Sequence, residues 1–142
     1  MTDQHHTRHR RRFYDEYAGD YDRWMRFYDP LVLGDRRREV CSRARGRTLE
    51  LAIGTGLNLP FYPDGVQLTG VDLSPAMLAV AERRARELGV DAELSVGDAH
   101  SLEFPDDRFD TVVSTLFFSS VPDPRRAAAE VLRILKPGGS CC

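Results

Sequence analysis

Three carboxylates and a pair of glycines are the residues whose types and spacing could do chemistry in this chain. Glu50 lies in an apolar run that leads into Gly54-Thr55-Gly56, and Asp72 ends the next apolar run, sixteen residues after Gly56. Asp98 comes just after a third such run. Glycines let the backbone turn tightly and approach a ligand closely. Asp72 could accept hydrogen bonds from both hydroxyls of a ribose, and Asp98 could accept one from an exocyclic amine such as that of adenine.

The elements that must position these residues alternate between strand and helix. Strands are expected at 48–53, 67–72, 92–96 and 109–115, and helices at 32–44, at 75–88 and from 123–124 to just before Pro137. This alternation indicates an α/β fold, a Rossmann-like parallel sheet with helices on both faces. Ligands bind such sheets outside the carboxyl ends of the strands, so the carboxylates and glycines are expected to gather there.

Local signals mark the helix ends and their buried faces. Ser74 and Pro75 suit the start of the helix at 75–88, and Gly89 suits its end. The expected buried stripes are Met77, Leu78, Ala81, Ala85 and Leu88 in that helix, and Ala128, Val131, Leu132 and Leu135 in the next one.

The N-terminal residues differ from the rest in composition. Residues 1–12 are rich in histidine and arginine and are interpreted as a disordered basic tail, which leaves 13–142 as one domain. A second interpretation is an arm that makes a peripheral contact with anionic lipid or an acidic partner. The aromatic residues that follow recur every three or four positions, which predicts one face of a helix: Tyr14, Tyr17, Tyr21, Trp24 and Tyr28. This helix could pack on the domain, cover a ligand, or do both. The arginines at 36–38 are expected to be solvated.

The loop after the first strand helps to identify the ligand. A phosphate-binding loop needs Lys and Ser/Thr after its glycines, but Leu57-Asn58-Leu59-Pro60 follows here. The dinucleotide pattern G-x-G-x-x-G also lacks its third glycine. A cluster of carboxylates suits a cationic ligand better than a pyrophosphate. S-adenosylmethionine, a nucleoside with a sulfonium and an ammonium group and no phosphate, has that character.

Composition excludes several other classes of protein. The chain has 142 residues, 42% of them hydrophobic, and a net charge of −2, so nucleic acid is not an expected partner. No apolar run is long enough to span a bilayer, and no secretory signal is recognised. Cys41, Cys141 and Cys142 lack metal-ligand spacing, so no metal site is predicted and a cytoplasmic location is expected. Cys41 is expected to be buried.

Five segments resemble, in order, the successive motifs of class I S-adenosylmethionine-dependent methyltransferases. They are Thr48–Gly56, Gly70–Met77, Gly97–Ala99, Phe109–Val113 and Leu135–Gly139. Residues 58–63 and 120–124 are similar to a smaller bacterial branch that includes phospholipid N-methyltransferases and small-thiol methyltransferases. The resemblance covers about residues 13–139 and implies S-adenosylmethionine as cofactor, with a small-molecule or lipid methyl acceptor.

The resemblance also implies roles for individual residues. Glu50 would hold the methionine amino group, directly or through water, and Gly54 and Gly56 would line the methionine portion. Asp72 would bind the ribose hydroxyls, with Leu73 and Met77 beside the adenine. Asp98 and Ala99 would meet the adenine edge, and Thr115 would lie near the reacting end. Ala52 stands where the family has its first glycine, a replacement that is expected to be tolerated.

The end of the chain departs from the family pattern. The family fold has seven strands, whereas this chain stops at Ser140-Cys141-Cys142, where the fifth would begin. The expectation is therefore a truncated sheet of the first four strands, in the order 3-2-1-4, without the substrate wall that later strands build. A bare edge on the fourth strand could then pair with a second copy.

Methyl transfer from a sulfonium is an in-line displacement that depends mainly on positioning. No general base is recognised, His100 included, and no catalytic residue is assigned. The acceptor could be a lipid, a thiol, a quinone or another small metabolite. The alternatives are a cofactor-binding fragment without activity and, with less support, an NAD-type oxidoreductase.

Overall fold

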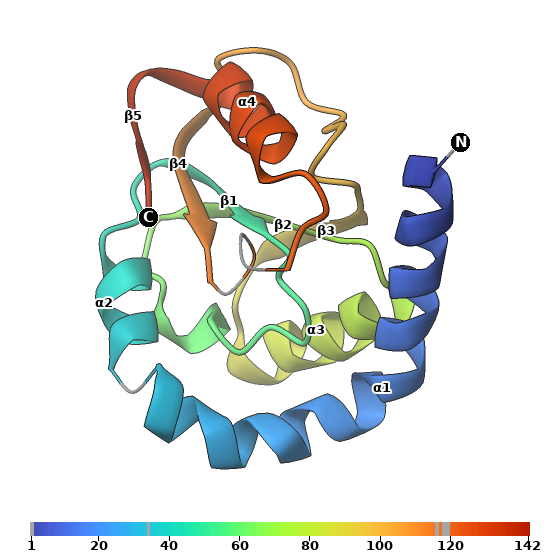
Figure 1. Ribbon diagram of the computed structural model, residues 1–142. Helices are drawn as coiled ribbons and strands as arrows, with labels where there is room; N and C mark the ends of the chain where they lie inside the picture. The colour runs from blue at the N-terminus through green and yellow to red at the C-terminus, as the bar shows by residue number, and fades with distance from the viewer. Residues whose placement is uncertain (1, 34, 116, 118–119) are drawn as a thin grey trace.

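The computed structural model covers residues 1–142 and describes all of them except 1, 34, 116 and 118–119; for 2–6, 26 and 28–32 it describes the backbone alone (Figure 1). The elements, in chain order, are α1 (Thr2–Val32), α2 (Arg36–Ser42), β1 (Arg47–Leu51), the 3-10 helix η1 (Leu59–Phe61), β2 (Gln67–Asp72), α3 (Pro75–Leu88), β3 (Ala92–Val96), β4 (Phe109–Ser114), α4 (Pro124–Ile134) and β5 (Leu135–Cys141).

The strands form one parallel sheet in the order β3-β2-β1-β4-β5, which confirms the predicted order of the first four. In β1, Glu50 lies opposite Gly70 of β2 and Val113 of β4. The carboxyl ends of β1, β2 and β4 therefore lie at one edge of the sheet, as the site requires.

Strand β5 corrects the expectation that the sheet stops after four strands. Residues Leu135–Cys141 pair in parallel with β4. Beyond them, the Cys142 N–H donates to the Val112 carbonyl at 2.8 Å, and the Cys142 carbonyl accepts from the Ser114 N–H at 2.9 Å. An uncovered strand edge leaves backbone groups without partners, and β5 supplies those partners to β4. The hypothesis that a bare β4 edge drives dimerisation therefore loses its basis.

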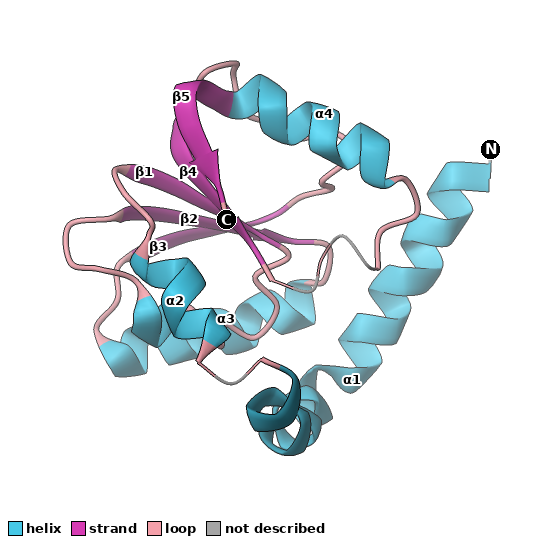
Figure 2. Ribbon diagram, turned by 60° about the vertical axis from the view of Figure 1, so that its left-hand side comes forward, coloured by secondary structure: helices cyan, strands magenta, loops and turns pink. Residues whose placement is uncertain are grey.

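Helices cover both faces of the sheet, as predicted: α4 packs on one face, and α2 and α3 lie on the other (Figure 2). Leu49 and Leu51 of β1 join the core cluster that contains Val131 and Ile134 of α4. Side chains alternate along a strand, so Thr48 and Glu50 point to the opposite face. The buried carboxylate of Glu50 thus faces the layer of α2 and α3.

The helix signals are largely confirmed. Helix α3 has the predicted bounds, the Ser74 hydroxyl accepts from the Met77 N–H at 3.1 Å, and Gly89 has φ 67°. Two predictions of burial are wrong, because Leu88 is 47% exposed and Leu132 is 74% exposed. In α4 the buried residues are Ala127, Val131 and Ile134, whose spacing of four and three makes a face one residue away from the predicted one.

Helix α1 includes residues 2–12, for which a disordered tail was predicted, and here the structure differs from the prediction. Arginine, which dominates this segment, is a good helix former. The helix is also fixed to the domain farther along, through Asp15 and Asp22. In the part of the chain that the structure describes, no helix combines the length and the hydropathy needed to cross a membrane.

Candidate functional site

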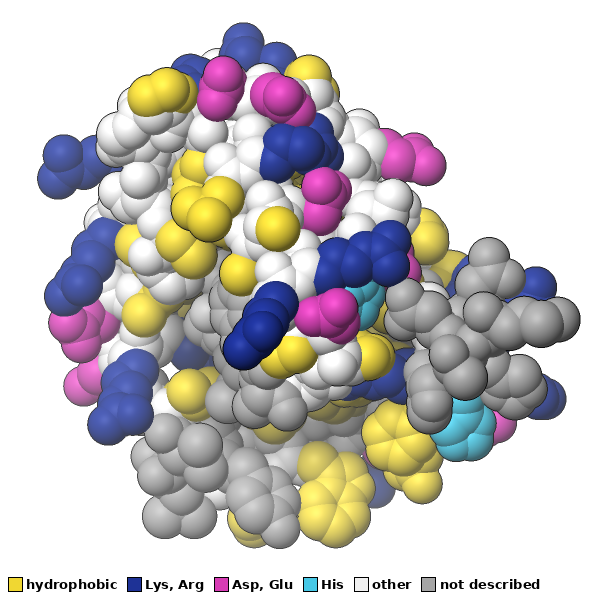
Figure 3. Space-filling model, turned by 45° about the horizontal axis from the view of Figure 1, so that its top comes forward, with side chains coloured by type: hydrophobic (Ala, Val, Ile, Leu, Met, Phe, Trp, Pro, Cys, Tyr) yellow, Lys and Arg dark blue, Asp and Glu magenta, His cyan; other side chains and the backbone are white. Residues whose placement is uncertain are grey.

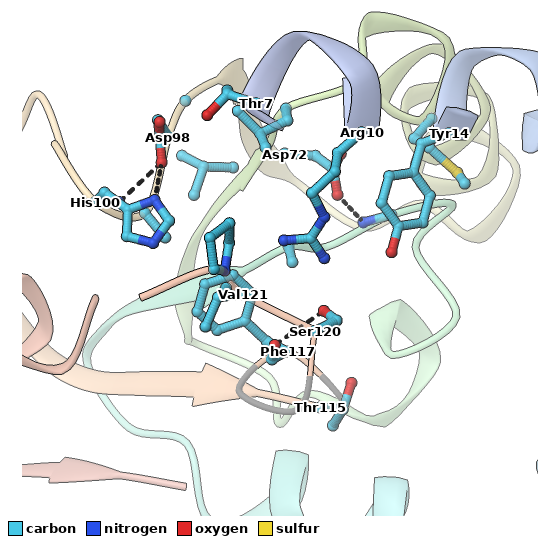
Figure 4. Close-up of a pocket in the computed structure, with 18 of the residues that line it drawn as sticks. Thr7, Arg10, Tyr14, Asp72, Asp98, His100, Thr115, Phe117, Ser120 and Val121 are labelled. Atoms are coloured by element: carbon cyan, nitrogen blue, oxygen red, sulfur yellow. Dashed lines mark hydrogen bonds and ion pairs between the residues drawn. The ribbon is translucent and has the colours of Figure 1, made fainter. Parts of the chain in front are cut away.

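A cavity lies outside the carboxyl ends of the strands, between the sheet, Phe117 with residues 120–122, and the inner side of α1 (Figure 4). Seven of the nine predicted site residues line it: Gly54, Asp72, Leu73, Met77, Asp98, Ala99 and Thr115. Glu50 and Gly56 are absent from this lining. The topology therefore brings most of the predicted site together and places two of its members behind the wall.

The loop after β1 turns sharply through three residues with positive φ. These are Ala52 (53°), Gly54 (59°) and Gly56 (82°). The left-handed conformation costs a residue with a Cβ roughly 1–2 kcal/mol, so Ala52 adopts it at the expense of some strain. A Cβ on Gly56 would lie 2.6 Å from the Leu59 side chain and 3.3 Å from Ala81 of α3. Gly56 thus allows the loop to pack closely on α3, whereas Gly54 faces the cavity.

Asp72 is a cavity acid that two backbone amides hold in place. Its side chain accepts from the Gly54 N–H and from the Ser74 N–H, each at 2.9 Å, and the residue is 9% exposed. Burial raises the pKa of Asp72 above its ordinary value, although these backbone donors oppose the rise. The carboxylate is therefore fixed in orientation at the end of β2 and available to hydroxyl donors in the cavity.

Asp98 is held by the histidine two residues later. One of its carboxylate oxygens lies 2.9 Å from the backbone N–H of His100 and 2.9 Å from the ring Nδ1 of the same residue. His100 is 8% exposed and also lines the cavity, so its loop position did not make it solvated. Its ring Nε2 lies 3.4 Å from the Asp123 N–H. The imidazole is thus placed to orient Asp98 rather than to act as a free base.

Glu50 lies in a buried polar network behind the cavity. Its two oxygens accept from Asn58 Nδ2 at 2.7 Å and from the Tyr62 hydroxyl at 2.8 Å, and the residue is 2% exposed. Burial, the largest influence, raises the pKa of Glu50 to about 7, while Tyr62, Asn58 and the charge of Arg37 act in the opposite direction. Glu50 is therefore poised between its charged and neutral forms near neutral pH.

Arg37 completes this network and corrects the expectation that arginines 36–38 form a solvated face. It is 6% exposed, and its guanidinium donates to Asn58 Oδ1 at 2.8 Å and to Thr115 Oγ1 at 3.3 Å. The Asn58 amide also donates to Thr115 Oγ1 at 3.1 Å. Thr115 lines the cavity, so these contacts join the wall of the site to the buried Glu50.

Helix α1 supplies the outer wall. Thr7, Arg10, Tyr14 and Tyr21 line the cavity, and Arg10 and Tyr14 point into it (Figure 4). The predicted aromatic face divides, because Tyr17 and Trp24 are exposed while the side chain of Tyr28 lies outside the described residues. Of the predicted face, Tyr14 and Tyr21 border the cavity.

Two acids fix α1 to the domain. Asp15 accepts from the Ser74 hydroxyl at 2.5 Å, at the start of α3. Asp22 accepts from the Thr55 hydroxyl at 2.6 Å and pairs with Arg84, which also donates to the Thr55 carbonyl at 2.6 Å. Both contacts connect α1 to the elements that carry the site.

The side chains that line the cavity fit a cationic nucleoside. Asp72 and Asp98 provide acceptors for ribose hydroxyls and an adenine amine, and Leu73, Met77 and Phe117 provide an apolar lining. After Gly56, residues 57–60 include neither the lysine nor the Ser/Thr that follows the glycines of a phosphate-binding loop. Among the described residues, no group of His, Cys, Asp and Glu could hold a metal ion.

Sequence reasoning missed several contributors to the site, among them Asn58, Arg37, Thr7 and Arg10. A signal existed for Asn58, a polar residue between Leu57 and Leu59 just after the glycine loop. None singled out Arg37, since it stands in a run of three arginines, or Thr7 and Arg10, since they lie in the basic segment interpreted as a tail. Their roles depend on how α1 and α2 pack on the sheet.

Comparison with known proteins identifies relatives of this chain. The family "Methyltransferase domain" matches residues 49–142. The chain is 40% identical over 132 residues to the phosphatidylethanolamine N-methyltransferase of Cereibacter sphaeroides, covering 88% of this chain and 65% of that protein. It is 39% identical over 110 residues to the demethylmenaquinone methyltransferase of Thermus thermophilus, covering 73% and 50%.

A solved structure shows the same similarity. A SAM-dependent methyltransferase of Thermotoga maritima, described as a possible histamine N-methyltransferase, matches with a TM-score of 0.68 at 29% identity, covering 89% of this chain and 56% of that one. The chain thus spans between half and two thirds of the length of these three relatives.

Proposed function

This chain belongs to the methyltransferase family, and on that premise we propose that it binds S-adenosylmethionine in the cavity and transfers a methyl group to a small-molecule or lipid acceptor. The observation that carries the proposal is the fixed carboxylate of Asp72, oriented by the Gly54 and Ser74 amides beside an apolar cavity. Neither the fragment without activity nor the NAD-type oxidoreductase is favoured by the relatives.

The nucleoside half of the cofactor would occupy the side of the cavity between Asp72 and Asp98. Asp72 would accept from the ribose hydroxyls, and Leu73 and Met77 would flank the adenine. Asp98, oriented by His100, would accept from the adenine amine beside Ala99. The positions of these side chains in the cavity lining support this assignment.

The methionine half would extend toward the ends of β1 and β4. Gly54 would approach it directly, while Gly56 would shape the loop from behind. Glu50 would act on the amino group through Asn58 or through water, since both of its oxygens already accept hydrogen bonds from protein groups. Thr115 would lie near the reacting end, oriented by Arg37 and Asn58.

The reaction would depend mainly on positioning. When bound, S-adenosylmethionine supplies an electrophilic methyl group on a sulfonium. The chain's part would be to hold donor and acceptor in line, and such orientation can contribute about 7–11 kcal/mol. Tyr14 and Tyr21 would exclude water from that side. No general base is assigned to the acceptor.

For the acceptor we favour a lipid over a thiol. The two curated relatives named above are methyltransferases whose names specify phosphatidylethanolamine and demethylmenaquinone, both lipids. The cavity wall formed by Phe117, Val121 and Tyr14 is compatible with an apolar acceptor.

The test is methyl transfer by the 142-residue chain from labelled S-adenosylmethionine to vesicles that contain phosphatidylethanolamine, or to a reduced demethylmenaquinone, with a small thiol for comparison. The proposal predicts label in one of the lipids, lost in Asp72→Asn and retained in the exposed-site control Asp91→Asn. A folded chain that binds the cofactor but labels no acceptor would favour the cofactor-binding domain without activity.

We further propose a reducing, cytoplasmic setting. The three cysteines are free thiols, and Cys41 is fully buried, as predicted. Burial raises the pKa of Cys41 to about 12, which keeps this thiol protonated and unreactive.

A further inference from the structure

Helix α1 exposes a stripe of large aromatic side chains. Its members, here called the aromatic stripe, are Phe13 (52% exposed), Tyr17 (46%), Trp24 (61%) and Phe27 (76%). Their spacings of four, seven and three residues place them on one face of a helix. The Phe13 and Tyr17 rings lie 4.5 Å apart, centroid to centroid. Figure 3 shows hydrophobic side chains on the surface along the lower rim of the molecule, where α1 runs in Figure 1.

The stripe differs from ordinary scattered exposure of apolar residues. The other large hydrophobic side chains that are exposed in the described part of the chain, Leu88, Val96 and Leu132, come from three different elements. Exposed apolar side chains grouped on one surface of a folded domain commonly mark a contact surface. The aromatic stripe groups four such side chains on one face of a single helix.

The charges of α1 indicate what the stripe contacts. Among its described side chains, the exposed arginines are Arg8, Arg11, Arg12 and Arg23, and the exposed carboxylates are Glu16 and Asp20. Arg8, Arg11 and Arg12 precede the stripe and make its N-terminal end basic although the chain has a net charge of −2, whereas Glu16 and Asp20 lie beside and between the aromatic residues. Aromatic residues beside arginines are typical of helices that lie in the headgroup region of an anionic membrane.

A neighbouring face of the same helix is committed to the cavity. Thr7, Arg10, Tyr14 and Tyr21 line it, and Asp15 and Asp22 fix the helix to α3 and to the loop after β1. The stripe is therefore held outward by contacts that the domain itself makes. A surface on which it rests would lie beside the wall of the cavity.

We propose that the aromatic stripe and its neighbouring arginines dock this protein on the surface of an anionic phospholipid membrane. Docking places the α1 wall of the cavity at the lipid interface, from which a lipid acceptor could enter. The docking itself goes beyond the proposed reaction, because it needs neither cofactor nor methyl transfer.

Trp24 makes the proposal directly testable, because it is the only tryptophan in the sequence. The purified chain is titrated with phosphatidylglycerol-containing vesicles and with pure phosphatidylcholine vesicles, and both sedimentation and Trp24 emission are recorded. The expected result is co-sedimentation with the anionic vesicles and a shift of the emission to shorter wavelength, both weakened by added salt.

Matched variants test whether vesicle binding depends on the aromatic stripe or on any exposed apolar side chain. Phe13→Ser with Phe27→Ser keeps the reporter and should weaken binding to the anionic vesicles at least tenfold. Arg11→Gln with Arg12→Gln should weaken it and reduce its salt dependence. Leu132→Ser, which removes an equally exposed apolar side chain on α4, should leave it unchanged.

Several outcomes would overturn the proposal. One is a folded chain that neither sediments with anionic vesicles nor shifts its emission. Another is equal loss of binding in Leu132→Ser and in the Phe13/Phe27 variant. Self-association that the Phe13/Phe27 variant abolishes, without vesicle binding, would instead identify a protein interface. Affinity for S-adenosylhomocysteine, measured on the same samples, tests the proposed function independently.

Discussion

At the scale of single residues, the burial of Glu50 has a measurable consequence, since a carboxylate that is 2% exposed is costly to ionise. Its folded-state pKa of about 7 lies above the ordinary 4.5, so the folded state binds the proton more tightly than the unfolded state does. The stabilisation of the folded state that comes from this tighter proton binding is fully present below about pH 4.5 and is lost as the pH rises through 7. Its size is about 3 kcal/mol.

Glu50→Gln removes this titration. We therefore expect the free energy of unfolding of the wild type, taken relative to Glu50→Gln, to fall by about 3 kcal/mol between pH 4.5 and pH 8. Urea unfolding of both proteins at a series of pH values measures this difference in the free energy of unfolding. Parallel pH profiles for the two proteins would show that Glu50 does not titrate as the structure implies.

The buried guanidinium of Arg37 gives a second prediction at this scale. Arg37→Met leaves Asn58 Oδ1 without this donor and removes a positive charge near Glu50, so we expect a loss of about 3 kcal/mol in the free energy of unfolding. Arg36→Met, at an exposed position of the same helix, is expected to change it by less than about 0.5 kcal/mol. Similar losses in the two variants would contradict the buried network.

Sequence reasoning worked at this scale where a residue type is unusual in its setting. The position of Asp72 and Asp98 at the cavity could be predicted, because acids at or just after the end of an apolar strand need a partner or a ligand. Arg37 could not, because its burial depends on the packing of α2 against β4 and the loop after β1.

Among the helices and strands, α1 bears directly on the proposed function, because it forms the outer wall of the cavity. Asp22 accepts from Thr55 and pairs with Arg84, so Asp22→Ala should weaken the docking of α1 by about 1.5 kcal/mol. Amide hydrogen exchange in α1 should then accelerate about tenfold, with weaker binding of S-adenosylhomocysteine. The exposed Asp20→Ala on the same helix is the control. Unchanged exchange in Asp22→Ala would show that other contacts hold the helix.

The elements themselves were predictable to different degrees. The bounds of α3 followed from Ser74, Pro75 and Gly89, which are strong local signals. Strand β5 was missed because Lys136-Pro137-Gly138-Gly139 reads locally as a turn. The unpaired edge of β4, a tertiary feature, is what draws that segment into the sheet.

In the whole molecule, helix α1 lies between the cavity that contains Asp72 and the proposed membrane-facing surface. The proposed function depends above all on the binding of S-adenosylmethionine in that cavity. Removing a charged protein group that accepts hydrogen bonds from a ligand typically costs about 1.5–3 kcal/mol of binding free energy, which corresponds to a roughly tenfold to hundredfold loss of affinity.

The most direct test is calorimetric titration of the 142-residue chain with S-adenosylhomocysteine, with NADH as the comparison ligand. The account predicts micromolar binding of S-adenosylhomocysteine and none of NADH. Asp72→Asn should weaken the binding at least tenfold, and the exposed Asp91→Asn should leave it unchanged. A folded wild type that does not bind S-adenosylhomocysteine, or an Asp72→Asn variant that binds it as tightly as the wild type, would contradict the account.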